Sequence, residues 1–65
     1  MNKPRMKLYR NDWSLFADAP TYPGGMYSVT LRNAAGNVHD KVRCDTAADA
    51  RTYWRTFDAI ARAAR

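Results

Sequence analysis

The sequence has few redox-active or metal-binding side chains. Cys44 is its only cysteine and His39 its only histidine, so one chain cannot form an internal disulfide or supply the four Cys and His ligands of a usual zinc site. This cysteine usage is typical of a reducing compartment. Cys44 lies in an apolar alternation just before a predicted helix, which favours a small buried hydrophobe over a reactive thiol.

Long apolar runs are also missing. A membrane-spanning helix needs about 20 consecutive apolar residues, and arginines interrupt even the alanine-rich C-terminal stretch. The basic N-terminal stretch 1–13 is followed by no apolar segment of the kind that secretory signals carry. We therefore expect a protein without a membrane partner that resides in the cytoplasm of a bacterium or of a host cell.

Catalytic side chains are sparse. The chain has no Glu, a single His and only two serines, Ser14 and Ser28, which leaves no recognisable pair of nucleophile and base. Most Asp residues occupy turns, loops, a helix cap or a helix surface. Gly24 and Gly25 belong to a turn, and no glycine-rich phosphate-binding loop is present. We expect a protein that is not an enzyme and uses no cofactor and no metal.

Positive charge is what the chain has in excess. It carries 11 Lys and Arg against 6 acidic residues, a net charge of +5, which favours an anionic partner. Most of the basic residues are Arg, whose planar guanidinium suits phosphate and carboxylate, although codon bias explains part of this excess. The frequent Ala and Arg codons indicate a GC-rich genome, bacterial or carried by a phage or plasmid.

The hydrophobic pattern predicts an α+β fold. An apolar fraction of 46% indicates a folded core. We expect residues 1–6 to form a flexible basic arm and residues 7–65 a single small domain, a three-stranded antiparallel β-sheet packed against one C-terminal α-helix (β-β-β-α). Residues 7–17 are predicted to hold either two short strands or one strand interrupted at Asn11-Asp12, and residues 18–25 to form a loop. Two further predicted strands, at 26–32 and 38–44, are joined by a turn that contains Gly36. The predicted helix is capped by Asp45 or Thr46 and runs to the end of the chain.

The two strands after residue 25 alternate between apolar and polar side chains. The apolar face collects Tyr27, Val29, Leu31, Val38, Val42 and Cys44. The opposite, solvent-facing side collects Ser28, Thr30, Arg32, His39, Lys41 and Arg43. Asp40 breaks the alternation, so either a bulge redirects its side chain or it is an edge acid paired with an Arg or a backbone donor.

The predicted helix has three faces. A core stripe spans about 120° and is expected to pack on the sheet; it consists of Ala50, Tyr53, Trp54, Phe57, Ile60, Ala61 and Ala64. A second strip holds Arg51, Arg55, Arg62 and Arg65 around Asp58, which is spaced to pair with Arg55 and Arg62, and we interpret it mainly as solvated surface. A third strip of small side chains would permit the close approach of a second copy in a homodimer. It consists of Ala48, Thr52, Thr56, Ala59 and Ala63.

Residues 26–55 resemble a known family of DNA-binding domains. The residues that carry the resemblance are Asp45, Thr46, Ala47, Ala50, Trp54 and the hairpin residue Gly36. They are similar to the AP2-type domain and the related arm-binding domains of phage-type integrases, in which a three-stranded sheet lies in the DNA major groove and a helix backs it. The resemblance implies DNA contact through the outer face of the sheet. Arg43 and Cys44 stand where the family usually has a Gly and an aromatic residue.

The basic sheet face predicts a small non-enzymatic DNA-binding module that holds the phosphates of duplex DNA. The predicted contacts are Arg32, Lys41 and Arg43, with His39 on the same face and Arg5 or Arg10 as auxiliaries. The alternative is a protein-interaction module of a phage or plasmid that binds an acidic protein surface. Such a module would be an inhibitor of a host defence system, of anti-CRISPR or anti-restriction type, or an accessory subunit.

Two aromatic side chains lie outside the predicted core. Trp13 and Tyr22 stand next to turn or loop residues, so we expect both to be partly exposed. They would form either a lid over the open end of the sheet or anchors for a partner.

Overall fold

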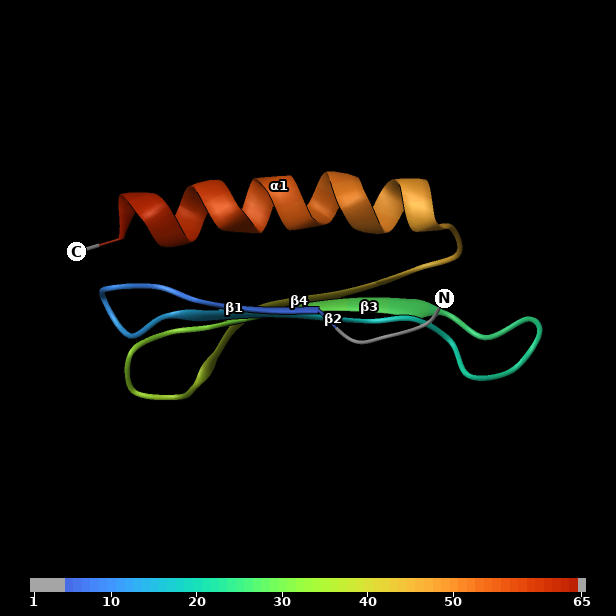
Figure 1. Ribbon diagram of the computed structural model, residues 1–65, viewed down its shortest axis with the longest axis horizontal. Helices are drawn as coiled ribbons and strands as arrows, with labels where there is room; N and C mark the ends of the chain where they lie inside the picture. The colour runs from blue at the N-terminus through green and yellow to red at the C-terminus, as the bar shows by residue number, and fades with distance from the viewer. Residues whose placement is uncertain (1–4, 65) are drawn as a thin grey trace.

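The computed structural model describes residues 5–64, which form four strands and one helix (Figure 1). The elements are β1 Arg5–Leu8, β2 Ser14–Asp18, β3 Tyr27–Arg32, β4 Val38–Cys44 and α1 Ala47–Ala63. The predicted α+β class, antiparallel sheet and C-terminal helix are confirmed. The prediction of three strands was wrong, because residues 5–18 form two strands of their own. Arg5 and Met6, which we expected in an arm, begin β1, and residues 1–4 lie outside the described residues.

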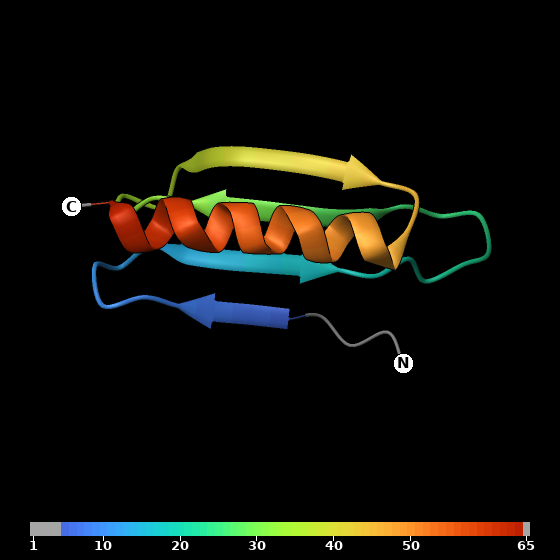
Figure 2. The same cartoon turned by 90° about the horizontal axis from the view of Figure 1, so that it is seen from above.

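The strands follow one another across a single antiparallel sheet in the order β1-β2-β3-β4. The helix lies on one face of this sheet, over the central strands β2 and β3, so the molecule has two layers (Figures 1 and 2). Nothing in the described part of the chain covers the opposite face, which we call the outer face. A two-layer fold of this kind leaves one face of the sheet for solvent or a partner.

A tight turn separates β1 from β2. The N–H of Asp12 donates to the carbonyl of Tyr9, and the N–H of Tyr9 donates to the carbonyl of Trp13, both at 3.0 Å. Asp12 has a φ of +69°, in the left-handed region that Asp tolerates better than most residues. The side-chain oxygen of Asn11 accepts the N–H of Trp13 (3.1 Å). The Asn11-Asp12 pair therefore ends one strand and allows a second to begin.

The turn between β3 and β4 repeats this geometry. The N–H of Gly36 donates to the carbonyl of Asn33, and the N–H of Asn33 donates to the carbonyl of Asn37, both at 2.9 Å. Gly36 has a φ of +86°, which confirms the predicted turn position. The side-chain oxygen of Asn33 accepts the N–H groups of Ala35 (3.0 Å) and Asn37 (3.1 Å), so an asparagine stabilises each of the two turns.

The core lies between the helix and the sheet. Its buried apolar side chains are Leu15, Val29, Leu31, Cys44, Phe57 and Ala61. Leu15 and Leu31 are direct partners across β2 and β3, so the two central strands present one continuous apolar layer to the helix. Phe57 and Ala61 cover this layer, which confirms the middle of the predicted helix stripe. Tyr53, at the margin of that stripe, is 39% exposed.

A β-bulge in β4 changes the predicted alternation. The register shifts between Leu31, which pairs with Asp40, and Arg32, which pairs with Val38, so that His39 is the extra residue. Val38 therefore lies beside Arg32 and is 49% exposed, and its predicted place in the core was wrong. Asp40 stays beside Leu31 at the exposed edge, where its carboxylate accepts the next backbone N–H (3.0 Å). It is an edge acid bonded to a backbone donor.

Side chains cap both ends of α1. Thr46 is the N-cap, as predicted, and its hydroxyl accepts the N–H of Asp49 (3.1 Å). At the other end, the side-chain amide of Asn11 donates to the carbonyls of Ala61 (3.0 Å) and Ala64 (3.2 Å). The carbonyl of Ala64 lies beyond the last hydrogen bond of the helix, whereas that of Ala61 also accepts the N–H of Ala64 (3.3 Å). The turn of the first hairpin therefore anchors the C-terminal end of the helix.

A polar cluster ties β1 to the helix. One oxygen of Asp58 accepts hydrogen bonds from the Tyr9 hydroxyl (2.5 Å) and the Lys7 ammonium (2.9 Å), and the other accepts from Nε of Arg62 (2.9 Å). The hydrogen bonds from Tyr9 and Lys7 lower the pKa of Asp58 to about 2. Burial and the bond to Asp58 raise the pKa of Tyr9. Asp58 thus pairs with Arg62, as predicted, whereas its second ion-pair partner is Lys7 and not Arg55.

Candidate nucleic-acid interface

The outer face of the sheet is divided into two chemically different halves. Strand register and alternation determine which side chains it carries. On β1 and β2 they are Met6, Leu8, Ser14, Phe16 and Asp18. On β3 and β4 they are Ser28, Thr30, Arg32, Val38, Lys41 and Arg43. We call the β1–β2 part the apolar half and the β3–β4 part the basic half.

The basic half brings together three of the predicted contact residues. Lys41 and Arg43 alternate along β4, about 7 Å apart by the rise of a strand, and lie beside the hydroxyl side chains of β3. Arg32 lies on the same face near the turn, where Nη1 donates to the carbonyl of Gly36 (2.9 Å). This bond orients the guanidinium and leaves its other donors free for an anion. None of the three cations forms a salt bridge with an acid among residues 5–64.

The apolar half was not predicted from the sequence. Leu8 is 71% exposed, Met6 is 64% exposed and Phe16 is 38% exposed, and Met6 and Phe16 are partners across the ladder. The signal was present in the sequence, because Leu15 and Phe16 are adjacent and strand alternation must send one of them outward. Exposed apolar side chains on a face that also carries cations suit contact with nucleobases or with another protein.

The bulge removes His39 from the basic half. The imidazole lies against the indole of Trp13, with ring centroids 5.0 Å apart, and Trp13 packs against the core on the helix side of the sheet. The predicted row of His39, Lys41 and Arg43 therefore keeps only its last two members on the outer face. The physical reason is that one extra residue in a strand exchanges the faces to which the side chains before the bulge point.

The two predicted auxiliary residues lie apart from the basic half. The guanidinium carbon of Arg5 is 4.5 Å from the centroid of the Trp54 ring, on the helix side of the sheet, in a cation–π contact. Arg10 is exposed in the turn between β1 and β2. The structure therefore does not bring either arginine together with Lys41 and Arg43.

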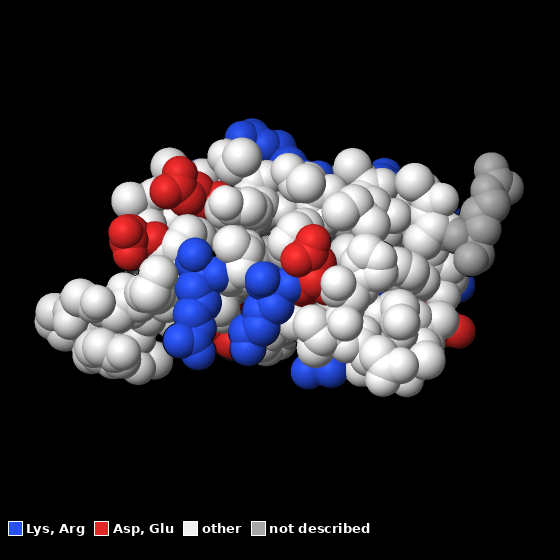
Figure 3. Space-filling model, turned by 180° about the vertical axis from the view of Figure 1, so that it is seen from behind, with Lys and Arg blue, Asp and Glu red and all other residues white. Residues whose placement is uncertain are grey.

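The predicted basic strip of the helix lies in the other layer. Arg51 and Arg55 are exposed on α1, whereas Arg62 is held in the ion pair with Asp58. Arg65 lies outside the described residues. Figure 3 shows one side of the molecule, on which Lys and Arg form separate groups with acidic side chains elsewhere on the same surface. The charge on this side is therefore dispersed over both layers.

The two predicted aromatic anchors differ in exposure. Trp13 is half-buried between His39 and the core. Tyr22 is 67% exposed in the loop between β2 and β3. Its ring lies close over Gly25, where an added Cβ would come within 3.1 Å of Cζ of Tyr22 and 2.8 Å of Cβ of Pro20. Tyr22 therefore remains available to a partner, and the lack of a side chain at Gly25 allows the loop to fold closely.

Cys44 is buried, as predicted, with 7% of its surface exposed. Its thiol donates to the carbonyl of Thr46 (3.8 Å), and burial raises its pKa, which disfavours the reactive thiolate. Residues 5–64 contain no group of three or more His, Cys, Asp or Glu side chains that could hold a metal ion. Over the same residues, no helix has the length and apolar character needed to cross a membrane.

The fold and the surface define a small two-layer α+β domain with one open sheet face that is half apolar and half basic. No family model, no curated protein and no solved structure matches the chain.

Proposed function

We propose that the protein is a small DNA-binding module that holds duplex DNA on the basic half of its sheet. The observation that carries the proposal is that Arg32, Lys41 and Arg43 share one open face, with no acid paired to them in the described part of the chain. A two-stranded antiparallel ribbon fits the major groove of DNA, and β3 and β4 form such a ribbon. The three cations would contact phosphates on its flanks.

Neighbouring side chains add to this proposal. Ser28 and Thr30 lie beside Arg43 and Lys41, and their hydroxyls can donate to phosphates or to base edges. Phe16 is the partner of Thr30 on the other side, and an exposed Phe can contact the methyl group of thymine. The resemblance to AP2-type and integrase arm-binding domains supports the same face, although this sheet has a fourth strand.

The number of cations sets the expected strength of binding. Neutralising about three phosphates predicts a slope of about −2.7 in a plot of log K against log salt concentration. Non-specific affinities of such sites are about 10⁻⁴ to 10⁻⁶ M at physiological salt. We therefore expect weak binding that becomes readily measurable only at low salt.

Fluorescence anisotropy with a labelled mixed-sequence duplex tests the proposal. The double variant Lys41→Ala/Arg43→Ala should bind at least about tenfold more weakly at low salt, with a slope reduced by about 2. The control Arg51→Ala/Arg55→Ala removes the same charge from the helix and should keep the slope of the native chain. Absence of binding by the native chain, or equal losses in the two double variants, would contradict the proposal.

A protein partner is the second candidate, and the apolar half favours it. Met6, Leu8 and Phe16 lie next to the cations on one face, as expected for an interface with an apolar centre and a charged rim. In this case the protein is an interaction module of a phage or plasmid, either an inhibitor of a host defence system or an accessory subunit. Both candidate functions place it in the cytoplasm.

Capture from a host lysate, with and without nuclease, separates the two candidates. A partner that survives nuclease treatment and is lost in Met6→Ser/Phe16→Ser favours the protein interface. Loss of all captured material on nuclease treatment favours DNA.

A homodimer through the Ala and Thr strip of the helix is compatible with either candidate. The hydroxyl of Thr52 donates to the carbonyl of Ala48 (3.2 Å), and that of Thr56 donates to the carbonyl of Thr52 (3.1 Å). The strip therefore presents a surface of small side chains with its hydroxyls already bonded. A sedimentation mass near twice 7.4 kDa would show the dimer.

A further inference from the structure

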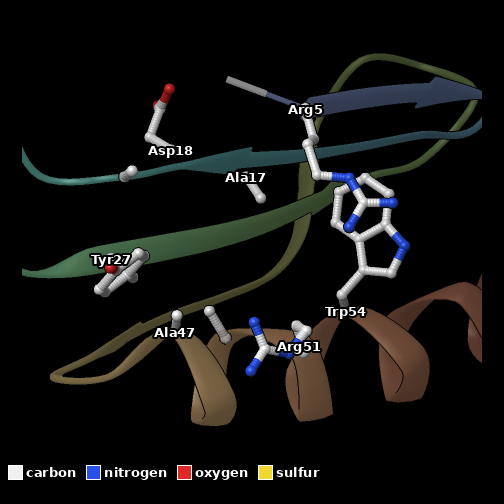
Figure 4. A pocket seen from close by; sticks show the side chains of 9 residues that line it. Arg5, Ala17, Asp18, Tyr27, Ala47, Arg51 and Trp54 are labelled. Atoms are coloured by element: carbon white, nitrogen blue, oxygen red, sulfur yellow. The ribbon is translucent and has the colours of Figure 1, made fainter. Parts of the chain in front are cut away.

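A cavity of about 210 Å³ lies between the N-terminal half of the helix and the β1–β2 side of the sheet, on the face opposite to the proposed DNA surface (Figure 4). Its walls are mainly apolar, formed by Ala17, Tyr27, Ala50 and Trp54. The cavity is smaller than the roughly 300–1,000 Å³ of sites that take drug-sized molecules. A cavity of about 150 Å³ can bind benzene, so this one suits a ligand with about one aromatic ring.

The cavity exists because small side chains meet at this end of the two layers. Elsewhere the space between helix and sheet is filled by Leu15, Leu31 and Phe57, whereas at this end Ala17 of β2 and Ala50 of α1 line the cavity. Within residues 5–64, the helix backbone comes close to β2, β3 and β4 but not to β1. The side chain of Arg5 spans the remaining distance from β1 to the helix.

Two arginines line the cavity, Arg5 from the sheet and Arg51 from the helix. Figure 4 shows Arg5 reaching from β1 onto the Trp54 ring, whereas the guanidinium of Arg51, which also lines the cavity, lies at the level of the helix. Arg51 and Trp54 are three residues apart, on one side of the helix. The one acid that lines the cavity, Asp18, points away from the helix, and no described acid forms a salt bridge with either arginine.

The two arginines and the apolar walls of the cavity together favour one kind of ligand. Two guanidinium groups without an acidic partner create a positive potential at the opening of the cavity, and a guanidinium matches the planar geometry of a carboxylate. The walls behind them are apolar and aromatic, which favours a ligand with an apolar body over a bare anion.

We propose that this cavity binds a small organic carboxylate, with its anionic group between Arg5 and Arg51 and its apolar part against Ala17, Ala50 and Trp54. The carboxylate belongs either to a free acid or to the C-terminal residue of a peptide, since both present the same group. The site is independent of the proposed DNA surface, because its residues face the helix and not the outer side of the sheet.

Titration of the ¹⁵N-labelled full chain with benzoate, followed by NMR, tests this site. The indole N–H signal of Trp54 should shift, whereas that of Trp13, at the other end of the helix–sheet interface, should not. Benzyl alcohol, which lacks the charge, and inorganic phosphate, which lacks the apolar body, should each bind at least about tenfold more weakly. A short peptide ending in phenylalanine, compared with its amidated form, tests the second source of the carboxylate.

Variants then assign the contacts. Arg5→Ala and Arg51→Ala should each weaken benzoate binding about tenfold or more, because a charge-assisted hydrogen bond is lost. Arg55→Ala is the matched control, since it removes the same charge one turn further along the helix, and it should bind as the native chain does. Ala17→Leu should abolish binding by filling the cavity, with its folding checked by the remaining amide signals. An unshifted Trp54 signal, equal binding of benzyl alcohol, or full affinity in Arg51→Ala would overturn the proposal.

Discussion

The two hairpins of the sheet have turns of the same geometry but carry different side chains on the outer face. Both turns have the same pair of backbone hydrogen bonds, and each places a left-handed residue at the same position, Asp12 in one and Gly36 in the other. The first hairpin nevertheless exposes an apolar outer surface and the second a basic one. Turn geometry and surface chemistry are therefore independent in this fold.

The difference arises from how each hairpin contacts the helix. In β1, the charged residues Arg5 and Lys7 face the helix, where they meet Trp54 and Asp58. Alternation then forces the apolar residues of β1 to the outer face. In β3, apolar residues face the helix and polar residues face outward, which is the usual arrangement for a sheet with one covered face. The distribution of polar and apolar side chains between the two faces of β1 is thus the reverse of that in β3.

The largest expected effect comes from comparing two leucines of the first hairpin. Leu15 is fully buried, so Leu15→Ala should lower the free energy of unfolding by about 2–5 kcal/mol. Leu8 is 71% exposed on the outer face, and Leu8→Ala should change it by less than about 0.5 kcal/mol. Urea denaturation followed by circular dichroism measures both. A large loss in Leu8→Ala would show that the outer face of β1 is covered.

A smaller effect is expected where the first hairpin is tied to the helix. Asp58→Asn should lower the free energy of unfolding by about 1–2 kcal/mol, because the bonds from Lys7, Tyr9 and Arg62 lose their charged acceptor. Hydrogen exchange in β1 should accelerate by more than the loss of global stability explains, whereas exchange in β4 should accelerate by no more than that loss. Equal acceleration in the two strands would contradict a cluster that serves only the first hairpin.

The same cluster gives a pH dependence with a definite sign. The pKa of Asp58 falls from the ordinary value of 3.8 to about 2 on folding, so its contribution to stability is fully present above pH 4 to 5 and is lost as the pH falls towards 2. Urea titrations should show that the difference in the free energy of unfolding between the native chain and Asp58→Asn shrinks as the pH falls through this range. A difference that stays constant down to pH 2 would be inconsistent with this ionisation.

The smallest effects are expected at the two left-handed positions. Gly36→Ala should destabilise the protein by about 1 kcal/mol, because its φ of +86° disfavours a side chain even though an added Cβ would meet no atom within 4 Å. Asp12→Gly should stabilise it by up to about 0.5 kcal/mol by relieving the same cost in the first turn. Thermal unfolding measures the melting temperature of each variant, which should fall in Gly36→Ala and rise in Asp12→Gly. A change of the same sign in both variants would show that the two turns are not equivalent.

Much of the second hairpin and the helix was predictable from local signals. Gly36 marks the turn, Thr46 marks the helix start, and the period of the helix predicts Phe57 as its core residue. The first hairpin was harder to predict. Its turn uses Asp12 where a glycine would be the clearer signal, and the contact of Lys7 with Asp58 joins residues far apart in sequence.

The candidate site was predictable only in part. Alternation places Lys41 and Arg43 on the outer face, but it fails at His39, because a bulge depends on pairing with a neighbouring strand and not on the strand's own residues. The cavity beside Arg5 and Arg51 results from small side chains that meet across two layers. No pattern within one segment of the sequence reveals that small side chains of the helix and the sheet lie at the same end of the interface.

NMR titration of the ¹⁵N-labelled protein with a short DNA duplex at low salt tests whether the basic half binds DNA. The largest shifts should fall on the amides of Ser28, Thr30, Lys41 and Arg43, with smaller shifts on the apolar half and none on the helix residues Arg51 and Arg55. Shifts concentrated on the helix, or no shifts at any DNA concentration, would contradict the assignment of the basic half as a DNA-binding surface.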